Sequence, residues 1–189
     1  MQTFTHAPQQ PSVSASLTQA VLHAAVALGL SRAELLSACG LTASHLDDPD
    51  ARVPLHSQQR LWSLIAEQLS EQEVGLAIGQ ALAPGQFSVL GYLLQSSLTL
   101  SDAVQAVQRF QRLAGEGGEI TLRSEGECLW LIYHAVKPEL PATRVRVLAL
   151  MAFWQRLMTP LLADFHLLGA RFMHAEPEDV QVYQQLFAC

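Results

Sequence analysis

The sequence is poor in charged residues and in lysine, and each shortage excludes a class of protein. Only 15% of the 189 residues are charged while 50% are hydrophobic, which excludes an intrinsically disordered chain. Lys137 is the only lysine, and 11 basic residues against 17 acidic ones give a net charge of -6. A chain of this charge has no electrostatic reason to bind the phosphate backbone of DNA or RNA.

Cysteine is also scarce. Cys39, Cys128 and Cys189 are far apart and form no C-x-x-C pair, which disfavours a disulfide framework or a zinc ribbon and fits reduced thiols in a cytoplasm. The seven histidines include no pair at i, i+4 on one helix and no H-E-x-x-H motif. We therefore expect neither a metal site nor a cofactor.

No hydrophobic run is long enough to cross a membrane. The longest, residues 145–158, is interrupted by Arg146, Gln155 and Arg156 and falls short of the roughly 20 apolar residues that a membrane-spanning helix requires. The first sixteen residues lack the basic segment and apolar run of an export signal. These observations predict a cytoplasmic protein without a membrane partner.

The spacing of apolar residues predicts an α+β fold. Residues 1–15 show little periodicity and are expected to form a disordered N-terminal arm, followed by a single domain over residues 16–189. The domain is predicted to begin with a helical N-terminal half that packs on a small antiparallel sheet with further helices. Helical spacing, capping signatures and glycine or proline breaks indicate helices over 17–30, 31–40, 54–69, 74–82, 87–97 and 99–114.

After Ala114 the spacing of the apolar residues changes from that of a helix to that of a β-strand. Alternating apolar residues predict a β-hairpin over 119–135, which a helix starting near Ala142 should cover. A further strand over 167–173 is expected to complete the antiparallel sheet, and Pro177 is expected to start the last helix.

Catalytic motifs are not apparent. The chain has no G-x-S-x-G, no Walker loop and no G-x-G-x-x-G, and its paired carboxylates fall at turns and helix starts. Cys128 and His134 lie on one face of a predicted strand, but six residues separate them by about 20 Å, too far for a catalytic dyad. Residues 31–46 have the pattern of a helix-turn-helix, yet its second helix offers no Arg or Lys to DNA. We predict that this chain is not an enzyme and does not itself bind DNA.

A set of short motifs nevertheless occurs in one order along the chain. They are Gly29-Leu-Ser, Glu34-Leu-Leu, Cys39-Gly-Leu, Leu46-Asp-Asp-Pro-Asp-Ala-Arg-Val-Pro54, Pro84-Gly-Gln-Phe87, Leu90-Gly-Tyr92, Ser97-Leu-Thr-Leu100 with Ala103, Arg109-Phe110, Arg171-Phe-Met-His174, Pro177, Tyr183 and Phe187-Ala-Cys189. Together they resemble the N-terminal, arabinose-binding-like domain of AraC-type transcription regulators over nearly all of residues 16–189.

The resemblance implies a regulatory domain that senses a small-molecule effector of unknown identity and mediates dimerisation. In such regulators a C-terminal module with two helix-turn-helix units follows, and the present sequence does not include it. DNA would therefore be contacted only through that missing domain, and the implied partner of this part is a second copy of itself, as a homodimer. Residues 17–30 and 145–158 are the candidate helices for the dimer interface.

A pocket for the effector is expected between the helical half and the hairpin. Aromatic residues would form its walls and arginines could receive a carboxylate. The candidate ligand-binding residues are Phe87, Tyr92, Phe110, Trp130, Tyr133, Phe153, Trp154, Arg144, Arg146 and Arg171.

Two other functions stay open at this point. The chain could be a stand-alone small-molecule-binding or protein-interaction module, or, more distantly, a small hydrolase. A parent reading frame without a basic helix-turn-helix region would favour the module, and turnover of simple esters, amides or phosphates would favour the hydrolase.

Overall fold

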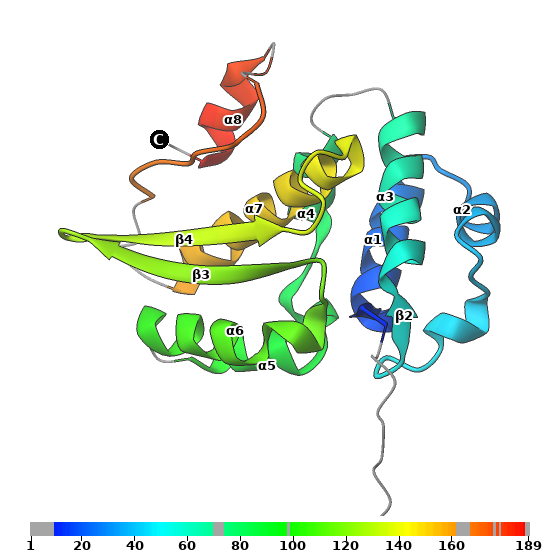
Figure 1. Ribbon diagram of the computed structural model, residues 1–189, viewed down its shortest axis with the longest axis horizontal. Coiled ribbons are helices and arrows are strands. Elements are labelled where there is room, and N and C mark those ends of the chain that lie inside the picture. Colours follow the sequence, from blue (N-terminus) through cyan, green and yellow to red (C-terminus); the bar gives the residue numbers. More distant parts are fainter. Residues whose placement is uncertain are drawn as a thin grey trace, which may run out of the picture.

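The computed structural model describes residues 10–69, 74–97, 99–161, 167–175, 177 and 179–187, apart from the side chains of residues 84, 87–90, 100, 160 and 161. These residues form an α+β fold, as the sequence predicts (Figure 1). The elements, in chain order, are β1 (Ser12–Ser14), α1 (Ala15–Ala27), α2 (Arg32–Ala38), η1 (Ala43–Leu46), β2 (Arg52–Pro54), α3 (Leu55–Gln68), α4 (Val74–Ala81), η2 (Pro84–Phe87), α5 (Ser88–Ser96), α6 (Leu100–Ala114), β3 (Gly118–Glu125), β4 (Cys128–Ala135), α7 (Pro141–Leu161) and α8 (Val180–Phe187).

Capping residues fix where several helices begin. The hydroxyls of Ser14, Ser31 and Thr99 accept hydrogen bonds from the backbone N–H groups three residues later, at the starts of α1, α2 and α6. The caps predicted at Ser31 and Thr99 are thus confirmed. The pattern over residues 31–46 forms α2 and the four-residue 3-10 helix η1, which is too short to serve as a recognition helix.

The predicted disordered arm is wrong at its C-terminal end. Residues 1–9 lie outside the described residues, but Ser12–Ser14 form strand β1 and pair antiparallel with β2, with Val13 opposite Val53. Val13 is buried. A three-residue strand with one apolar residue carries no readable periodicity, and its partner lies 40 residues away, so local sequence could not reveal it.

The β3–β4 hairpin forms as predicted. Ile120 lies opposite Tyr133 and Leu122 opposite Leu131, so these four side chains share one face. Helix α6 runs alongside β3, while the C-terminal segment with α8 lies on the other side of the hairpin (Figure 1).

The predicted third strand over 167–173 is wrong. Residues 167–173 have no regular secondary structure, and both sheets among the described residues contain two strands. The apolar residues of this segment come in adjacent pairs, Leu167-Leu168 and Phe172-Met173, and so lack the alternation of a strand. Side chains anchor the segment instead: the Phe172 ring lies 5.7 Å from the Tyr183 ring and 5.6 Å from the Phe187 ring, measured between centroids.

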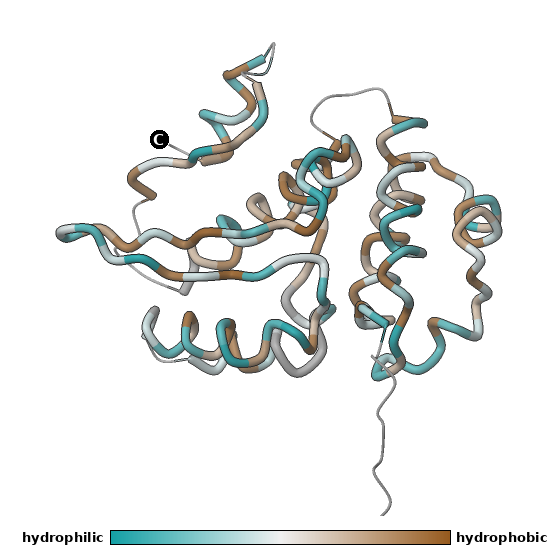
Figure 2. The backbone as a smooth tube through the Cα atoms, in the orientation of Figure 1, coloured by the Kyte–Doolittle hydropathy of each residue, from teal (hydrophilic) through white to brown (hydrophobic). Residues whose placement is uncertain are grey.

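Helices α4 and α7 pack closely against each other within a core to which α1, α2, α3 and α6 also contribute. Gly75 and Gly79 allow this approach, because a Cβ at either position would collide with α7 backbone. Hydrophobic residues dominate α1, α4 and α7, whereas α3 and α6 contain a mixture of hydrophilic and hydrophobic residues (Figure 2). The buried stripes of α1 and α7, named above as possible dimer faces, lie inside the core of a single chain.

Candidate functional site

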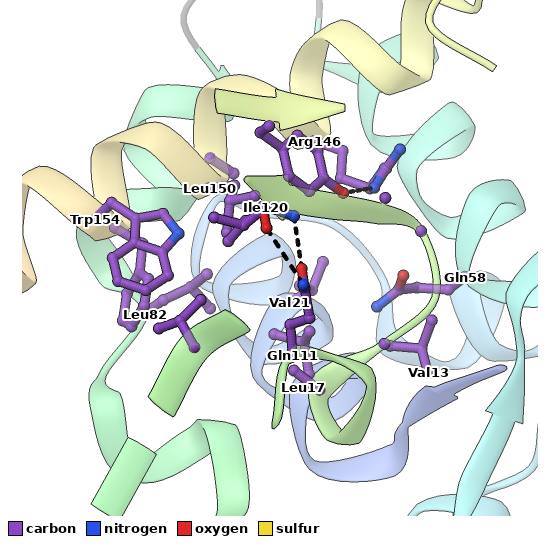
Figure 3. Close-up of a pocket in the computed structure, with 18 of the residues that line it drawn as sticks. Val13, Leu17, Val21, Gln58, Leu82, Gln111, Ile120, Arg146, Leu150 and Trp154 are labelled. Carbon is purple, nitrogen blue, oxygen red and sulfur yellow. Dashed lines mark hydrogen bonds between the residues drawn. The ribbon is translucent and has the colours of Figure 1, made fainter. Parts of the chain in front are cut away.

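A cavity of about 110 Å³ lies where α1, α3, α6, α7 and the start of β3 meet (Figure 3). Most of its lining side chains are aliphatic or aromatic, and polar groups are few. The cavity is lined by Val13, Leu17, Val21, Gln58, Trp62, Leu82, Leu94, Val107, Gln111, Ala114, Gly115, Gly117, Gly118, Ile120, Tyr133, Arg146, Ala149, Leu150, Phe153 and Trp154.

Two helices supply much of the apolar wall. Helix α1 presents Leu17 and Val21, which are one turn apart, and α7 presents Leu150 and Phe153. Val21 is fully buried and Phe153 is 2% exposed. These positions follow the period of the two helices, so the same periodicity that buries the helices also forms the wall.

Two tryptophans bring unpaired hydrogen-bond donors to the cavity. Trp62 is 4% exposed and Trp154 is 7% exposed, and the indole N–H of each is buried without a hydrogen-bond partner. In Figure 3 the indole nitrogen of Trp154 is on the side of its ring that faces Leu150 and Ile120. Buried N–H groups are nearly always paired, so two unpaired ones on residues that line one cavity are exceptional.

Arg146 places a positive charge at the same cavity. This residue is 9% exposed, and its Nη1 donates to the Tyr133 hydroxyl at 2.5 Å, while Nη2 donates to the Val136 carbonyl at 3.4 Å. These two contacts use two of the five N–H donors of a guanidinium. Neither acceptor carries a charge. Among the described residues, no carboxylate lies within ion-pair distance of Arg146.

The Tyr133 hydroxyl stays protonated beside this charge. Burial raises the pKa of Tyr133 above its ordinary value of 10.0, although the charge and the hydrogen bond of Arg146 act in the opposite direction. The phenol oxygen accepts from Arg146, so its own O–H remains available as a donor. Arg146 and Tyr133 therefore form a pair of adjacent donors.

Glycines bring the backbone close to this pair. A Cβ at Gly117 would lie 2.6 Å from Arg146 Nη1, and a Cβ at Gly118 would lie 2.5 Å from the Tyr133 hydroxyl oxygen. The segment leading into β3 can therefore touch the guanidinium and the phenol only because both positions lack a side chain.

Among the described residues, two glutamines border the cavity: the side-chain amide of Gln111 is hydrogen-bonded, and that of Gln58 is not. Gln111 Oε1 accepts from the Ile120 N–H at 2.6 Å, and its Nε2 donates to the Ile120 carbonyl at 3.3 Å, which ties α6 to β3. Gln58 is 4% exposed, and its amide makes no hydrogen bond to another described residue. Its amide points toward the middle of the lining residues (Figure 3). Gln58 thus offers one unsatisfied amide.

The described lining contains no acidic side chain. Glu116 lies between two lining glycines, but its Oε2 accepts from the N–H of Ser12 at 2.8 Å and lies 3.3 Å from the Ser12 hydroxyl. The cavity consequently combines one cation with neutral donors and apolar walls.

The structure brings together four of the ten residues predicted for the site: Tyr133, Arg146, Phe153 and Trp154 all line the cavity. Their contact with a ligand stays a prediction. The other predicted aromatic residues lie elsewhere. Tyr92 is 67% exposed, Phe110 is partly buried against the core, and Trp130 points to the opposite face of β4 from Tyr133. The side chain of Phe87 lies outside the described residues.

The other two predicted arginines are also away from the cavity. Arg171 is exposed, with its guanidinium carbon 4.5 Å from the centre of the Trp130 ring, a cation–π contact. Arg144 has its Nε and Nη2 atoms buried without a hydrogen-bond partner, but it does not line the cavity.

Sequence reasoning missed Val13, Gln58 and Trp62. Val13 lies in the segment expected to be disordered. Trp62 and Gln58 are one turn apart on α3, where the spacing of apolar residues could have placed Trp62 on the buried face. Gln58 lies on the same face as Trp62, but as a polar residue it adds no apolar signal of its own.

Among the described residues, no group of three or more His, Cys, Asp or Glu side chains could hold a metal ion. No helix in that part of the chain is both long and apolar enough to span a bilayer. What the described site provides is recognition chemistry: donors, one charge and apolar surface.

Fold and cavity together define a helix-rich α+β domain with a small, mostly apolar cavity between its helices and its hairpin. The chain belongs to the family described as the arabinose-binding domain of AraC transcription regulators, N-terminal, whose model matches residues 29–189. The resemblance found in the short ordered motifs is thereby confirmed. The chain is accordingly of the type found as the N-terminal regulatory domain in these regulators.

An ornithine utilization regulator of Pseudomonas aeruginosa is 28% identical to the chain over 110 residues. That match covers 58% of this chain and 32% of the regulator. The chain thus matches about a third of the length of this relative.

Proposed function

We propose that the domain senses a small-molecule effector, which binds in the cavity between α1, α6, α7 and the hairpin. The observation that carries this proposal is the presence of two unpaired buried donors on residues that line one cavity, the indole N–H groups of Trp62 and Trp154. Arg146 lines the same cavity, and its two recorded hydrogen bonds use two of its five N–H groups. Leaving such groups unpaired costs on the order of 1 to 3 kcal/mol each, so a ligand that pairs them gains that free energy.

The family supports a regulatory role for such binding. In an AraC-type regulator the effector must bind two states of the protein unequally, since a ligand of equal affinity shifts no equilibrium. The cavity touches β1, α1, α3, α6, α7 and the hairpin at once. A ligand there would change how these elements pack, and that change can reach a DNA-binding domain.

We also propose that the domain forms a homodimer and reaches DNA only through a C-terminal helix-turn-helix domain of the parent regulator. Regulators of paired half-sites hold two copies in fixed register. Because the stripes of α1 and α7 are used in the core, the dimer would use another surface. Sedimentation of the 189-residue chain at tens of micromolar tests this; a monomer would contradict it.

Thermal melts of the purified chain against a panel of compounds test the sensing proposal, because bound ligand raises stability by mass action. The panel contains short carboxylic acids, amino acids, sugars and their neutral derivatives, and the name of the Pseudomonas relative places ornithine among them. We expect at least one compound to raise the melting temperature in a saturable manner.

A matched pair of variants on α1 locates the binding. Val21→Phe would fill the cavity, whereas Val26→Phe adds the same ring at a position 37% exposed on the same helix. The active compound should lose its effect on Val21→Phe and keep it on Val26→Phe. Equal shifts in both variants, or no shift with any compound, would overturn the proposal.

A further inference from the structure

We propose that the cavity binds a short monocarboxylic acid as its anion, with the carboxylate against Arg146 and Tyr133 and the apolar body along α7. This inference rests on the proposed sensing function and specifies the chemical class of the effector. It follows from three properties of the described lining: one uncompensated cation, no acidic side chain and apolar walls.

The first property is the buried charge of Arg146. Arg146 as a whole residue is 9% exposed, and its recorded hydrogen-bond acceptors are a phenol oxygen and a backbone carbonyl. Buried charges are normally paired with an opposite charge, and a guanidinium matches a carboxylate in shape, with two parallel N–H···O bonds. The Tyr133 O–H, one hydrogen bond away, adds a third donor for the same anion.

The second property, the lack of an acidic side chain in the described lining, excludes most other ligands when it is combined with the single positive charge and the apolar walls. An ammonium group would find no carboxylate among the described lining side chains and would face Arg146 as a like charge. A sugar carries a hydroxyl on nearly every carbon, and the apolar walls of the cavity would leave most of these unpaired. A doubly charged anion such as phosphate would exceed the single positive charge available.

The third property, the apolar walls, sets the position of the apolar part of the ligand. Arg146, Leu150, Phe153 and Trp154 succeed one another along α7, and eight residues of helix span about 12 Å. A carboxylate at Arg146 therefore directs an alkyl chain along Leu150 and Phe153 toward Trp154. At about 110 Å³ the cavity is smaller than the ~150 Å³ cavity that accepts benzene, which limits the ligand to about six non-hydrogen atoms.

Three compounds that differ by one group test the inference. Sodium butanoate has the proposed charge and size, butanamide has the same shape without the charge, and 2-aminobutanoate adds an ammonium group. Binding to the 189-residue chain is followed by thermal melts and by the emission of the tryptophans. We expect butanoate to bind at least about 10-fold more tightly than butanamide, as a charge-assisted contact requires, and 2-aminobutanoate to bind more weakly than butanoate.

Two arginine variants assign this preference to one charge. Arg146→Met removes the cation and keeps an unbranched side chain, and we expect the preference for butanoate over butanamide to vanish or reverse. Arg171→Met removes an arginine that stacks on Trp130 outside the cavity and should leave the preference unchanged. The comparison of acid with amide on the unaltered chain stands even if Arg146→Met does not fold.

The outcomes separate the two proposals. If butanamide binds as tightly as butanoate and Val21→Phe abolishes both, the carboxylate inference is overturned while the sensing function stands. If neutral sugars or ornithine bind in the cavity and butanoate does not, the same conclusion holds. If no compound binds, both proposals fail.

Discussion

Arg146 Nη1 lies 2.5 Å from the Tyr133 hydroxyl oxygen and joins helix α7 to strand β4 at the edge of the cavity. The two residues are 13 positions apart in sequence, and the Arg146 guanidinium carbon also lies 5.8 Å from the centre of the Tyr133 ring. Through this contact the charge of Arg146 affects the titration of the Tyr133 hydroxyl.

The stability of the protein should therefore depend on Tyr133 at alkaline pH. Burial raises the pKa of the folded-state phenol above 10.0, so its contribution to stability is complete below about pH 10 and is lost as the pH rises through the raised pKa. Denaturant unfolding of the wild type and of Tyr133→Phe, from about pH 8 to pH 11, measures this contribution. The wild type should lose more stability than Tyr133→Phe over that range. Parallel curves would contradict the prediction.

Close packing of α4 against α7 should make Gly79 intolerant of a side chain. A Cβ at Gly79 would collide with the Ala149 carbonyl and lie 2.7 Å from the Ala152 Cβ. We expect Gly79→Ala to lower the free energy of unfolding by about 1 to 3 kcal/mol, despite the better helix propensity of alanine. Gly85→Ala is the control, because nothing lies within 4 Å of its Cβ position. Equal stabilities of the two variants would show that the helices can separate freely.

The Arg52 side chain joins three elements. It donates to the Ser12 hydroxyl and carbonyl on β1 and to the carbonyls of Arg112 and Leu113 at the end of α6. Cations at helix C-termini are favourable, and hydrogen bonds from charged donors are the stronger ones. We expect Arg52→Ala to cost about 1 to 3 kcal/mol in denaturant unfolding.

A surface ion pair provides the comparison for Arg52. Arg123 and Glu125 are 3.1 Å apart, with side chains 63% and 65% exposed. Arg123→Ala should change stability by less than about 1 kcal/mol. A cost for Arg123→Ala as large as that for Arg52→Ala would contradict the assignment of Arg52 as a structural clamp.

Two thiols should react very differently. Cys39 is buried, and burial raises its pKa above 9.0, with Arg60 partly opposing the shift, whereas Cys128 is exposed. In a Cys189→Ser background, an alkylating reagent should modify Cys128 in the native protein and reach Cys39 only after unfolding. Mass spectrometry would show one adduct before denaturation and two after it. Rapid native modification of Cys39 would contradict its burial.

The helices and the hairpin could be predicted because local signals fix them. The serine at position 31 and the threonine at 99 are recognisable caps, and Leu122, Leu131 and Tyr133 alternate as strand residues do. Strand β1 could not be predicted, since its stability comes from pairing with β2 and not from its own three residues. The prediction of a strand over 167–173 is wrong because apolar content without alternation does not indicate a strand.

The site was predictable along α7 and at Tyr133 on β4, but not at its other positions. Arg146, Phe153 and Trp154 recur at helical spacing, so one helix face collects them. Trp130 and Tyr92 are aromatic, like the residues that line the cavity. Whether they are buried depends on which face of β4 or α5 meets the core, and tertiary packing decides that. Within the described part of the chain, the lack of a carboxylate partner for Arg146 and the unpaired indole N–H groups of Trp62 and Trp154 are likewise properties of the packed chain.

The chain has three tryptophans, two of which line the cavity, and this allows the central claim to be measured directly. A variant that keeps only Trp154 (Trp62→Phe, Trp130→Phe) is titrated with sodium butanoate beside one that keeps only Trp130 (Trp62→Phe, Trp154→Phe). If a small carboxylate occupies the cavity beside Arg146, the emission of Trp154 changes and saturates while that of Trp130 does not. A saturable response of Trp130 with none from Trp154 would place the ligand elsewhere and contradict the account.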